Sequence, residues 1–268
     1  MRQIMFIDFH THPFHPKIAA KVCEYLHQHY NIPPVGNGLA EDLVGHLDKA
    51  GIDRAVALCA ATHVDQVGPA NAFSMELARK YPERIVPFGA MHPHCKNWEE
   101  HLGVIKKAGF KGIKFHPDFQ AFSMDDPALL PILEELGDEF MVMWHVGDLP
   151  PPEKNPSCPY KLEALRKRFP KARFIAAHLG GYRHWEHALK AYIGKPIYID
   201  TSSSLSFLDE AVIREILRRH PREYVLFGSD YPLFDASQEL WLLESKAGLK
   251  DSEIDEILSN GAKALGLC

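Results

Sequence analysis

The sequence lacks the features that mark several classes of protein. It contains no CxxC pair, and its cysteines are odd in number and irregularly spaced: Cys23, Cys59, Cys95, Cys158 and Cys268. A disulfide framework or a thiolate zinc site is therefore not expected. It also has no apolar run of about 18 residues, and the short apolar stretch near its start ends in Asp and His, unlike a signal peptide. We expect a cytoplasmic protein with no membrane partner.

The chain also has no excess of positive charge. The chain has 30 Lys and Arg against 35 Asp and Glu, a formal net charge of −5. A surface that binds nucleic acid or anionic membranes needs a basic patch to neutralise phosphates. We therefore expect no nucleic-acid partner. The charge balance is compatible with a small-molecule substrate, either neutral or anionic.

Short apolar runs recur along the whole chain, and a helix-like segment follows each of them. Nearly continuous hydrophobicity is typical of strands covered on both faces in a parallel sheet. Eight such alternations predict a (β/α)8 TIM barrel, with an open doubly wound sheet as the alternative. The length of 268 residues suits one domain over residues 1–268. The eight runs are residues 4–9, 54–60, 84–90, 111–116, 140–146, 173–179, 196–202 and 224–230.

Histidine, by contrast, is abundant, with 16 residues in the chain. His10 and His12 lie just after the first run, at the end of the first predicted strand, and in an extended segment residues at i and i+2 point the same way. Two imidazoles from one strand end could share a cation. An HxH pair alone is weak evidence for such a site.

Polar residues also close other apolar runs: His145 the fifth, His178 the sixth and Asp230 the eighth. The active sites of barrels are built at this end of the strands. Buried imidazoles and a carboxylate are costly unless they are paired, and together they form a metal shell with room for water. We expect one divalent cation, with zinc as the first choice because imidazole suits it, and manganese or iron also compatible.

Several motifs together resemble the amidohydrolase superfamily, in particular its amidohydrolase-related (amidohydrolase 2) branch. They are IDFHTH, KGIKFHP, the histidine after the fifth run, AAHLGG and FGSDYP, and the resemblance extends from residue 7 to the end. It implies a metal-dependent barrel enzyme in which His10, His12, His145 and Asp230 are metal ligands. Asp230 is then also the catalytic proton acceptor. His178 contacts the water or substrate in one-metal members and binds a second cation in two-metal members.

Three further residues are candidates for substrate binding. Lys114 lies near the end of the fourth predicted strand, where two-metal members carry a carboxylated lysine that bridges the cations. The alternative is an ammonium held by Asp118 or Asp230. His116 either touches the substrate or is a loop residue anchored before a proline. Arg183 either clamps a substrate carboxylate or forms a surface salt bridge.

The expected machinery is that of hydrolysis. A water activated by the cation, a carboxylate base and a polarising histidine fit a small ester, lactone or amide. The alternative is non-oxidative decarboxylation of a small unsaturated or aromatic carboxylic acid, since the same branch includes decarboxylases. A third hypothesis is a barrel that binds a ligand without turnover, and the presence of all five superfamily positions argues against it. Barrels of this branch are often dimers, which makes a homodimer an expectation.

Overall fold

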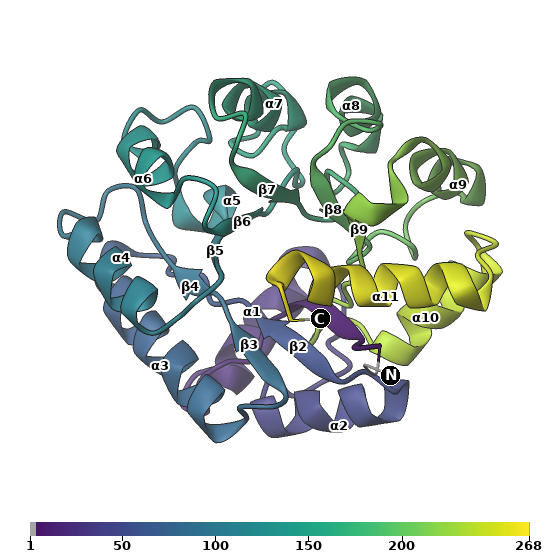
Figure 1. The fold of residues 1–268 in the computed structure, drawn as a ribbon, viewed down its shortest axis with the longest axis horizontal. Helices are drawn as coiled ribbons and strands as arrows, with labels where there is room; N and C mark the ends of the chain where they lie inside the picture. Colours follow the sequence, from purple (N-terminus) through teal and green to yellow (C-terminus); the bar gives the residue numbers. More distant parts are fainter. Residues whose placement is uncertain (1–3, 268) are drawn as a thin grey trace. The chain divides into compact units, whose positions relative to one another are not determined.

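The computed structural model describes residues 4–267 of the chain. Strands and helices alternate along most of it (Figure 1). The strands are β1 (Ile7–Thr11), β2 (Arg54–Ala57), β3 (Ile85–Pro87), β4 (Gly89–Ala90), β5 (Gly112–Phe115), β6 (Met141–Trp144), β7 (Arg173–Ala176), β8 (Tyr198–Asp200) and β9 (Val225–Leu226).

The helices differ more in length than the strands. None of those within residues 4–267 is both long and apolar enough to cross a membrane. They are α1 (Ala19–Tyr30), α2 (Ala40–Ala50), α3 (Val67–Lys80), α4 (Trp98–Lys107), α5 (Pro117–Gln120), α6 (Leu129–Leu136), α7 (Pro159–Arg168), α8 (Trp185–Ala191), α9 (Glu210–Arg219), α10 (Ala236–Ser245) and α11 (Asp251–Leu265), with short 3-10 turns at Val64–Gln66 and Arg222–Tyr224.

The chain folds into two compact units that interleave along the sequence. The first contains Met1–Leu58, Leu77–Val86 and Thr201–Cys268, and the second contains Cys59–Glu76 and Pro87–Asp200. Each unit carries part of the predicted set of strands, and each is described in turn.

In the first unit, β1 is the central element. It pairs in parallel with β2, and β3 follows β2 in the same sheet. On its other side β1 meets the segment that follows β9, because the Phe9 N–H donates to the Phe227 carbonyl at 2.7 Å. The register between β1 and β2 shifts between Asp8 and Thr11, where three steps along β1 match two along β2. Such bulges re-aim side chains and occur often beside active sites.

The second unit holds five parallel strands in the order β4-β5-β6-β7-β8. Every residue of β5 and β6 is buried, which fits their continuous apolar sequences. The rings of Phe115 and Trp144 stack at a centroid distance of 4.8 Å. Helices α7 and α8 pack against each other beside this sheet.

The structure confirms the alternating pattern and corrects its details. Each predicted run contains a strand, and the third contains two, β3 and β4, which Phe88 separates. The first strand ends at Thr11, two residues past the first apolar run. The long segment between the first two runs contains two helices, α1 and α2.

Helix α11 ends the chain and lies beside β1 and β9 (Figure 1). Its inner face carries Gly261, which lies very close to the core. A Cβ added at Gly261 would lie 2.8 Å from Cδ2 of Phe9 and 3.2 Å from Cβ of Ile7. Both neighbours are fully buried in β1, so they have little room to move. Glycine here therefore allows the close approach of the helix to the strand.

This packing predicts opposite effects for two glycine-to-alanine substitutions. G261A should lower the free energy of unfolding by about 1–3 kcal/mol through overpacking, although alanine favours a helix by up to about 1 kcal/mol. G103A in α4 is the matched control, because a Cβ there meets nothing within 4 Å, and it should be neutral or stabilising. Urea unfolding of both variants measures the difference. A G261A protein as stable as G103A would contradict the packing argument.

Candidate metal centre

Three side chains meet at the end of β1 in the first unit. Nε2 of His10 lies 3.1 Å from Nε2 of His12. Oδ1 of Asp230 lies 3.5 Å from the first of these nitrogens and 3.3 Å from the second. Ligands at about 2.0–2.2 Å from a cation are spaced about 3.0–3.5 Å from one another. The triangle of donor atoms therefore has the dimensions of one face of a coordination shell.

Backbone pairing holds this triangle in place. The Asp230 N–H donates to the His10 carbonyl at 2.8 Å, and the His12 N–H donates to the Tyr231 carbonyl at 2.7 Å. Beneath them, Oδ1 of the fully buried Asp8 accepts the N–H groups of His10 and Ser229 at 3.1 and 3.0 Å. These two bonds tie the backbones of the two strand ends together.

Both imidazoles are oriented through their other nitrogen. Nδ1 of His12 lies 2.9 Å from the Leu58 carbonyl, which only accepts, so Nδ1 carries the proton and Nε2 keeps its lone pair. Nδ1 of His10 lies 3.1 Å from Oγ of Ser202. Such partners fix the ring position of metal-binding histidines, and a carbonyl partner also fixes the tautomer. The two rings therefore present Nε2 to the centre of the triangle.

Asp230 is held from both sides. The Ser203 hydroxyl donates to its Oδ2, which leaves Oδ1 facing the two histidines. Its backbone has a φ of 67°. This left-handed conformation costs non-glycine residues of order 1–3 kcal/mol and is found often at functional sites.

Neither Ser202 nor Ser203 was found from the sequence. The run of hydroxyl residues directly after β8, residues 201–204, was the available signal.

In the second unit, two more candidates lie together. Nδ1 of His145 and Nε2 of His178 are 2.9 Å apart. This distance suits a hydrogen bond and equally suits two ligand atoms beside one cation. Nε2 of His145 is buried, and among residues 4–267 it has no hydrogen-bond partner. His178 has a φ of 64°, and its N–H donates to Oδ1 of Asp200 at 3.1 Å.

His116 packs against the ring of His145. The two imidazoles stack at 3.8 Å and 11°, and Phe119 stacks on the other face of His116 at 4.1 Å and 4°. Donor atoms of His116, Asp118 and His145 lie within 4.8 Å of one another. Parallel stacked rings, however, cannot direct their in-plane lone pairs at one ion. This group therefore builds a ring stack and not a second metal shell.

Asp118 anchors the loop after β6. Its Oδ1 accepts from Nδ2 of Asn155 at 3.0 Å and its Oδ2 from Oγ of Ser157 at 2.5 Å. Burial raises the pKa of this carboxyl above its usual range. Because two donors from residues 155–157 hold it, the proline-rich segment after β6 is pinned at this point.

Lys114 and Arg183 lie in very different surroundings. Lys114 is fully buried in β5, in register with Met143 of β6. Arg183 is exposed, with a φ of 59°, and its guanidinium lies 5.3 Å from the centre of the Tyr182 ring. The substrate roles of both residues, and of His116, stay predictions.

One residue that the sequence did not reveal fixes the loop ends of the second unit. Gln120 is buried in α5 and uses its whole amide group. Oε1 accepts the His116 N–H at 2.8 Å, and Nε2 donates to the carbonyls of Ala61 and Met91 at 2.7 and 2.8 Å. Gln120 thereby connects the segments after β2, β4 and β5.

A buried carboxyl in α10 gives the first unit an expected pH dependence. Neither oxygen of Glu239 has a hydrogen-bond partner among residues 4–267. Burial, with the nearby charges of Asp230 and Asp8, raises the pKa of Glu239 to about 8. The folded chain therefore keeps a proton that the unfolded chain releases above about pH 4.5. The contribution of Glu239 to the stability of the fold is therefore greatest below about pH 4.5, and it is lost as the pH rises to 8.

We predict that E239Q removes this loss. In the presence of a chelator, the variant should gain a few kcal/mol of unfolding free energy over the parent protein at pH 8–9 and very little at pH 5. Chemical denaturation at a series of pH values measures this. E244Q, which changes an exposed residue of the same helix, is the control. An identical pH dependence in E239Q and the parent protein would show that Glu239 does not titrate as described.

Comparison with solved structures identifies the fold. An uncharacterized TIM-barrel protein from Bordetella bronchiseptica matches with a TM-score of 0.80 and 18% identity, covering 98% of this chain and 99% of that chain. A dihydroxybenzoic acid decarboxylase from Polaromonas, with bound manganese and the inhibitor 2-nitroresorcinol, matches with a TM-score of 0.73 and 15% identity, covering 99% and 98%. A putative amidohydrolase from Staphylococcus aureus matches with a TM-score of 0.71 and 17% identity, covering 98% and 100%. These matches confirm the predicted (β/α)8 barrel.

No curated protein matches the sequence. The model of one family, described as Amidohydrolase, matches residues 7–265 in a single stretch. One domain over residues 1–268 stays a prediction. The match spans nearly the whole chain and includes the motifs on which the resemblance rested. The chain therefore belongs to the amidohydrolase family and is an enzyme of that family.

Proposed function

We propose that the protein is a metal-dependent hydrolase that acts on a small ester, lactone or amide. The observation that carries the proposal is the triangle of His10, His12 and Asp230, with donor atoms 3.1–3.5 Å apart. Two partly or fully buried imidazoles and a carboxylate at this spacing suit a cation.

We propose His145 as the fourth ligand. The strands of a (β/α)8 barrel end around one mouth, and His145 directly follows β6 as His10 and His12 lie at the end of β1. Its buried Nε2 and the 2.9 Å spacing of its Nδ1 from His178 support a role at a cation. Zinc suits three imidazoles and one carboxylate, and manganese is the ion in the similar decarboxylase.

A bound divalent cation would supply Lewis acidity, which polarises a carbonyl and lowers the pKa of water. Asp230 is the proposed acceptor of the proton that the attacking water loses. The Ser203 hydroxyl occupies its Oδ2, which keeps the carboxylate plane fixed and directs Oδ1 to the reacting centre. His178 is proposed to hydrogen-bond the substrate oxygen and to steady the charge that develops there.

The remaining candidates would bind the substrate. Lys114 is a buried cation if it is protonated, and it would attract an anionic or strongly polar group. Arg183 is exposed beside the Tyr182 ring and would contact a carboxylate at the outer edge of the mouth. His116 is stacked between Phe119 and His145, so it would contact the substrate through the edge of its ring.

Non-oxidative decarboxylation is the second candidate. It is favoured by the similarity to a dihydroxybenzoic acid decarboxylase over nearly the full length of both chains. The ring stack of Phe119, His116 and His145 would suit a planar aromatic acid. The same three ligands at the end of β1 serve either reaction, so the products must decide between them.

Metal analysis with a turnover screen tests the proposal. The purified protein should hold about one equivalent of zinc or manganese, and dialysis against a chelator should abolish activity that added metal restores. Lactones, esters, amides and aromatic carboxylic acids are offered in parallel, and released carbon dioxide is recorded. Hydrolysis of a lactone, ester or amide supports the first candidate. Carbon dioxide from the acids, with the others inert, selects the second and rejects the first.

We predict that D230N separates chemistry from binding. Asparagine tolerates the left-handed backbone conformation of this position and keeps an oxygen for the metal, but it accepts no proton. The kcat should fall by about 10²-fold or more, with the metal content largely kept. D209N, at an exposed carboxylate, should leave both unchanged. Turnover that survives D230N would exclude Asp230 as the proton acceptor.

A further inference from the structure

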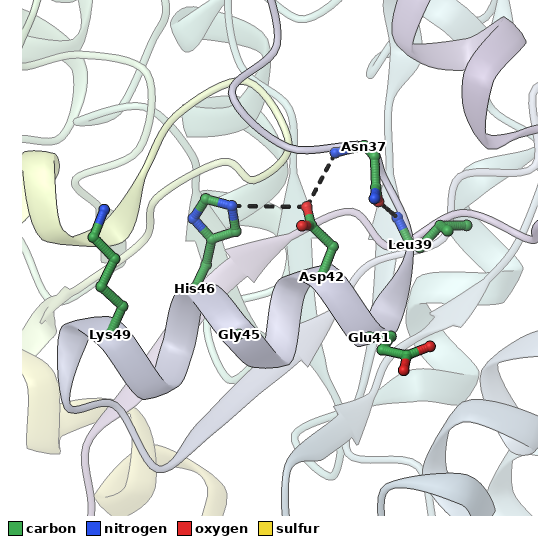
Figure 2. Close-up of a pocket in the computed structure, with 7 residues that line it drawn as sticks. All are labelled: Asn37, Leu39, Glu41, Asp42, Gly45, His46 and Lys49. Carbon is green, nitrogen blue, oxygen red and sulfur yellow. Dashed lines mark hydrogen bonds and ion pairs between the residues drawn. The ribbon is translucent and has the colours of Figure 1, made fainter.

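Helix α2 carries a network that leads from the surface to the candidate metal centre. A hollow of about 420 Å³ lies over the helix and is lined by the seven residues drawn in Figure 2, from Asn37 to Lys49. On its wall, Oδ2 of Asp42 accepts the Asn37 N–H at 3.0 Å and lies 3.7 Å from Nε2 of His46. Nδ1 of His46 in turn lies 2.7 Å from Oδ2 of Asp235. Asp42 is thus held on several sides.

The same carboxylate oxygen accepts a hydrogen bond from the core. The Tyr231 hydroxyl lies 2.7 Å from Oδ2 of Asp42, 3.1 Å from the Leu39 carbonyl, and accepts the Gly38 N–H at 3.1 Å. Burial and Asp42 both raise the pKa of Tyr231 far above its usual value. The phenol therefore stays protonated and is a permanent donor.

The segment before α2 leaves room for the Tyr231 ring because it carries a glycine at position 36. A Cβ added at Gly36 would lie 2.2 Å from Cε2 of Tyr231 and 2.9 Å from Oδ2 of Asp42. The Gly36 N–H also donates to the Pro232 carbonyl at 3.1 Å. The loop thus lies directly against the Tyr231 ring, which is itself fully buried. The phenol has one available position.

The backbone of Tyr231 belongs to the proposed metal centre. Its carbonyl accepts the His12 N–H at 2.7 Å, and the residue before it, Asp230, donates its N–H to His10 at 2.8 Å. A shift of the Tyr231 ring would therefore move two of the three donor groups. The anchor of that ring is on α2, 189 residues away in sequence.

We propose that Asp42 is a positioning residue for the metal centre, which it sets through the Tyr231 hydroxyl. The inference rests on the proposed function, because it needs a cation at His10, His12 and Asp230. Asp42 does not touch the cation or the substrate. It holds the ring whose backbone fixes Asp230 and His12, so its loss should loosen the ligand triangle while the barrel stays folded.

The test is the affinity of the metal-free protein for Mn²⁺, followed by the EPR signal of the free ion. D42A should raise the Kd for Mn²⁺ by about 10-fold or more, the range for groups that orient metal ligands. Y231F, which removes only the donor, should do the same. D42N keeps an acceptor oxygen and should restore an affinity close to that of the parent protein. E41Q, at an exposed neighbour in the same hollow, should change nothing.

A double variant tests whether Asp42 acts through Tyr231. D42A/Y231F should bind Mn²⁺ no more weakly than the weaker single variant, because both changes remove one interaction. Additive losses, or a Kd for Y231F within about 2-fold of the parent value, would overturn the proposal. Y231F decides this even if D42A does not fold. If the parent protein itself binds no Mn²⁺ or Zn²⁺, the proposed function fails first and this inference falls with it.

Discussion

The candidate site depends on one backbone interaction, the pairing of the end of β1 with the segment after β9. The Asp230 N–H donates to the His10 carbonyl, and the His12 N–H donates to the Tyr231 carbonyl. These two bonds bring together side chains that are separated by more than 200 residues in the sequence. Main-chain hydrogen bonds of this kind hold atoms in fixed positions, because each residue has only two soft backbone dihedral angles and strand pairing restricts both. The spacing of the donor atoms is therefore set by the fold and not by the side chains alone.

The surrounding polar groups make this placement useful for chemistry. The Leu58 carbonyl fixes the tautomer of His12, Ser202 contacts His10, and Ser203 holds Asp230. With these contacts in place, His10, His12 and Asp230 each direct one metal-binding atom to the centre of the triangle. The cost is a strained backbone at Asp230 and a buried carboxyl at Glu239. Backbone strain and a buried polar group of this kind are tolerated where a site must be preorganised.

The sequence was sufficient for the fold and for the residues with unusual chemistry. Eight apolar runs predicted the strands because a parallel sheet buries both faces, and His10, His12 and Asp230 stood out as polar residues at strand ends. It did not single out Ser202, Ser203 or Gln120, because hydroxyl and amide residues are common outside functional sites. Asp42 was invisible for another reason: its partner Tyr231 is adjacent only in the folded chain.

The most direct test of the account is anomalous X-ray diffraction from crystals of the protein grown with Zn²⁺ or Mn²⁺. We predict one strong anomalous peak about 2.0–2.3 Å from Nε2 of His10, Nε2 of His12 and Oδ1 of Asp230. A peak beside other residues, such as Asp42 or Asp118, or no peak within reach of these three atoms, would contradict the account.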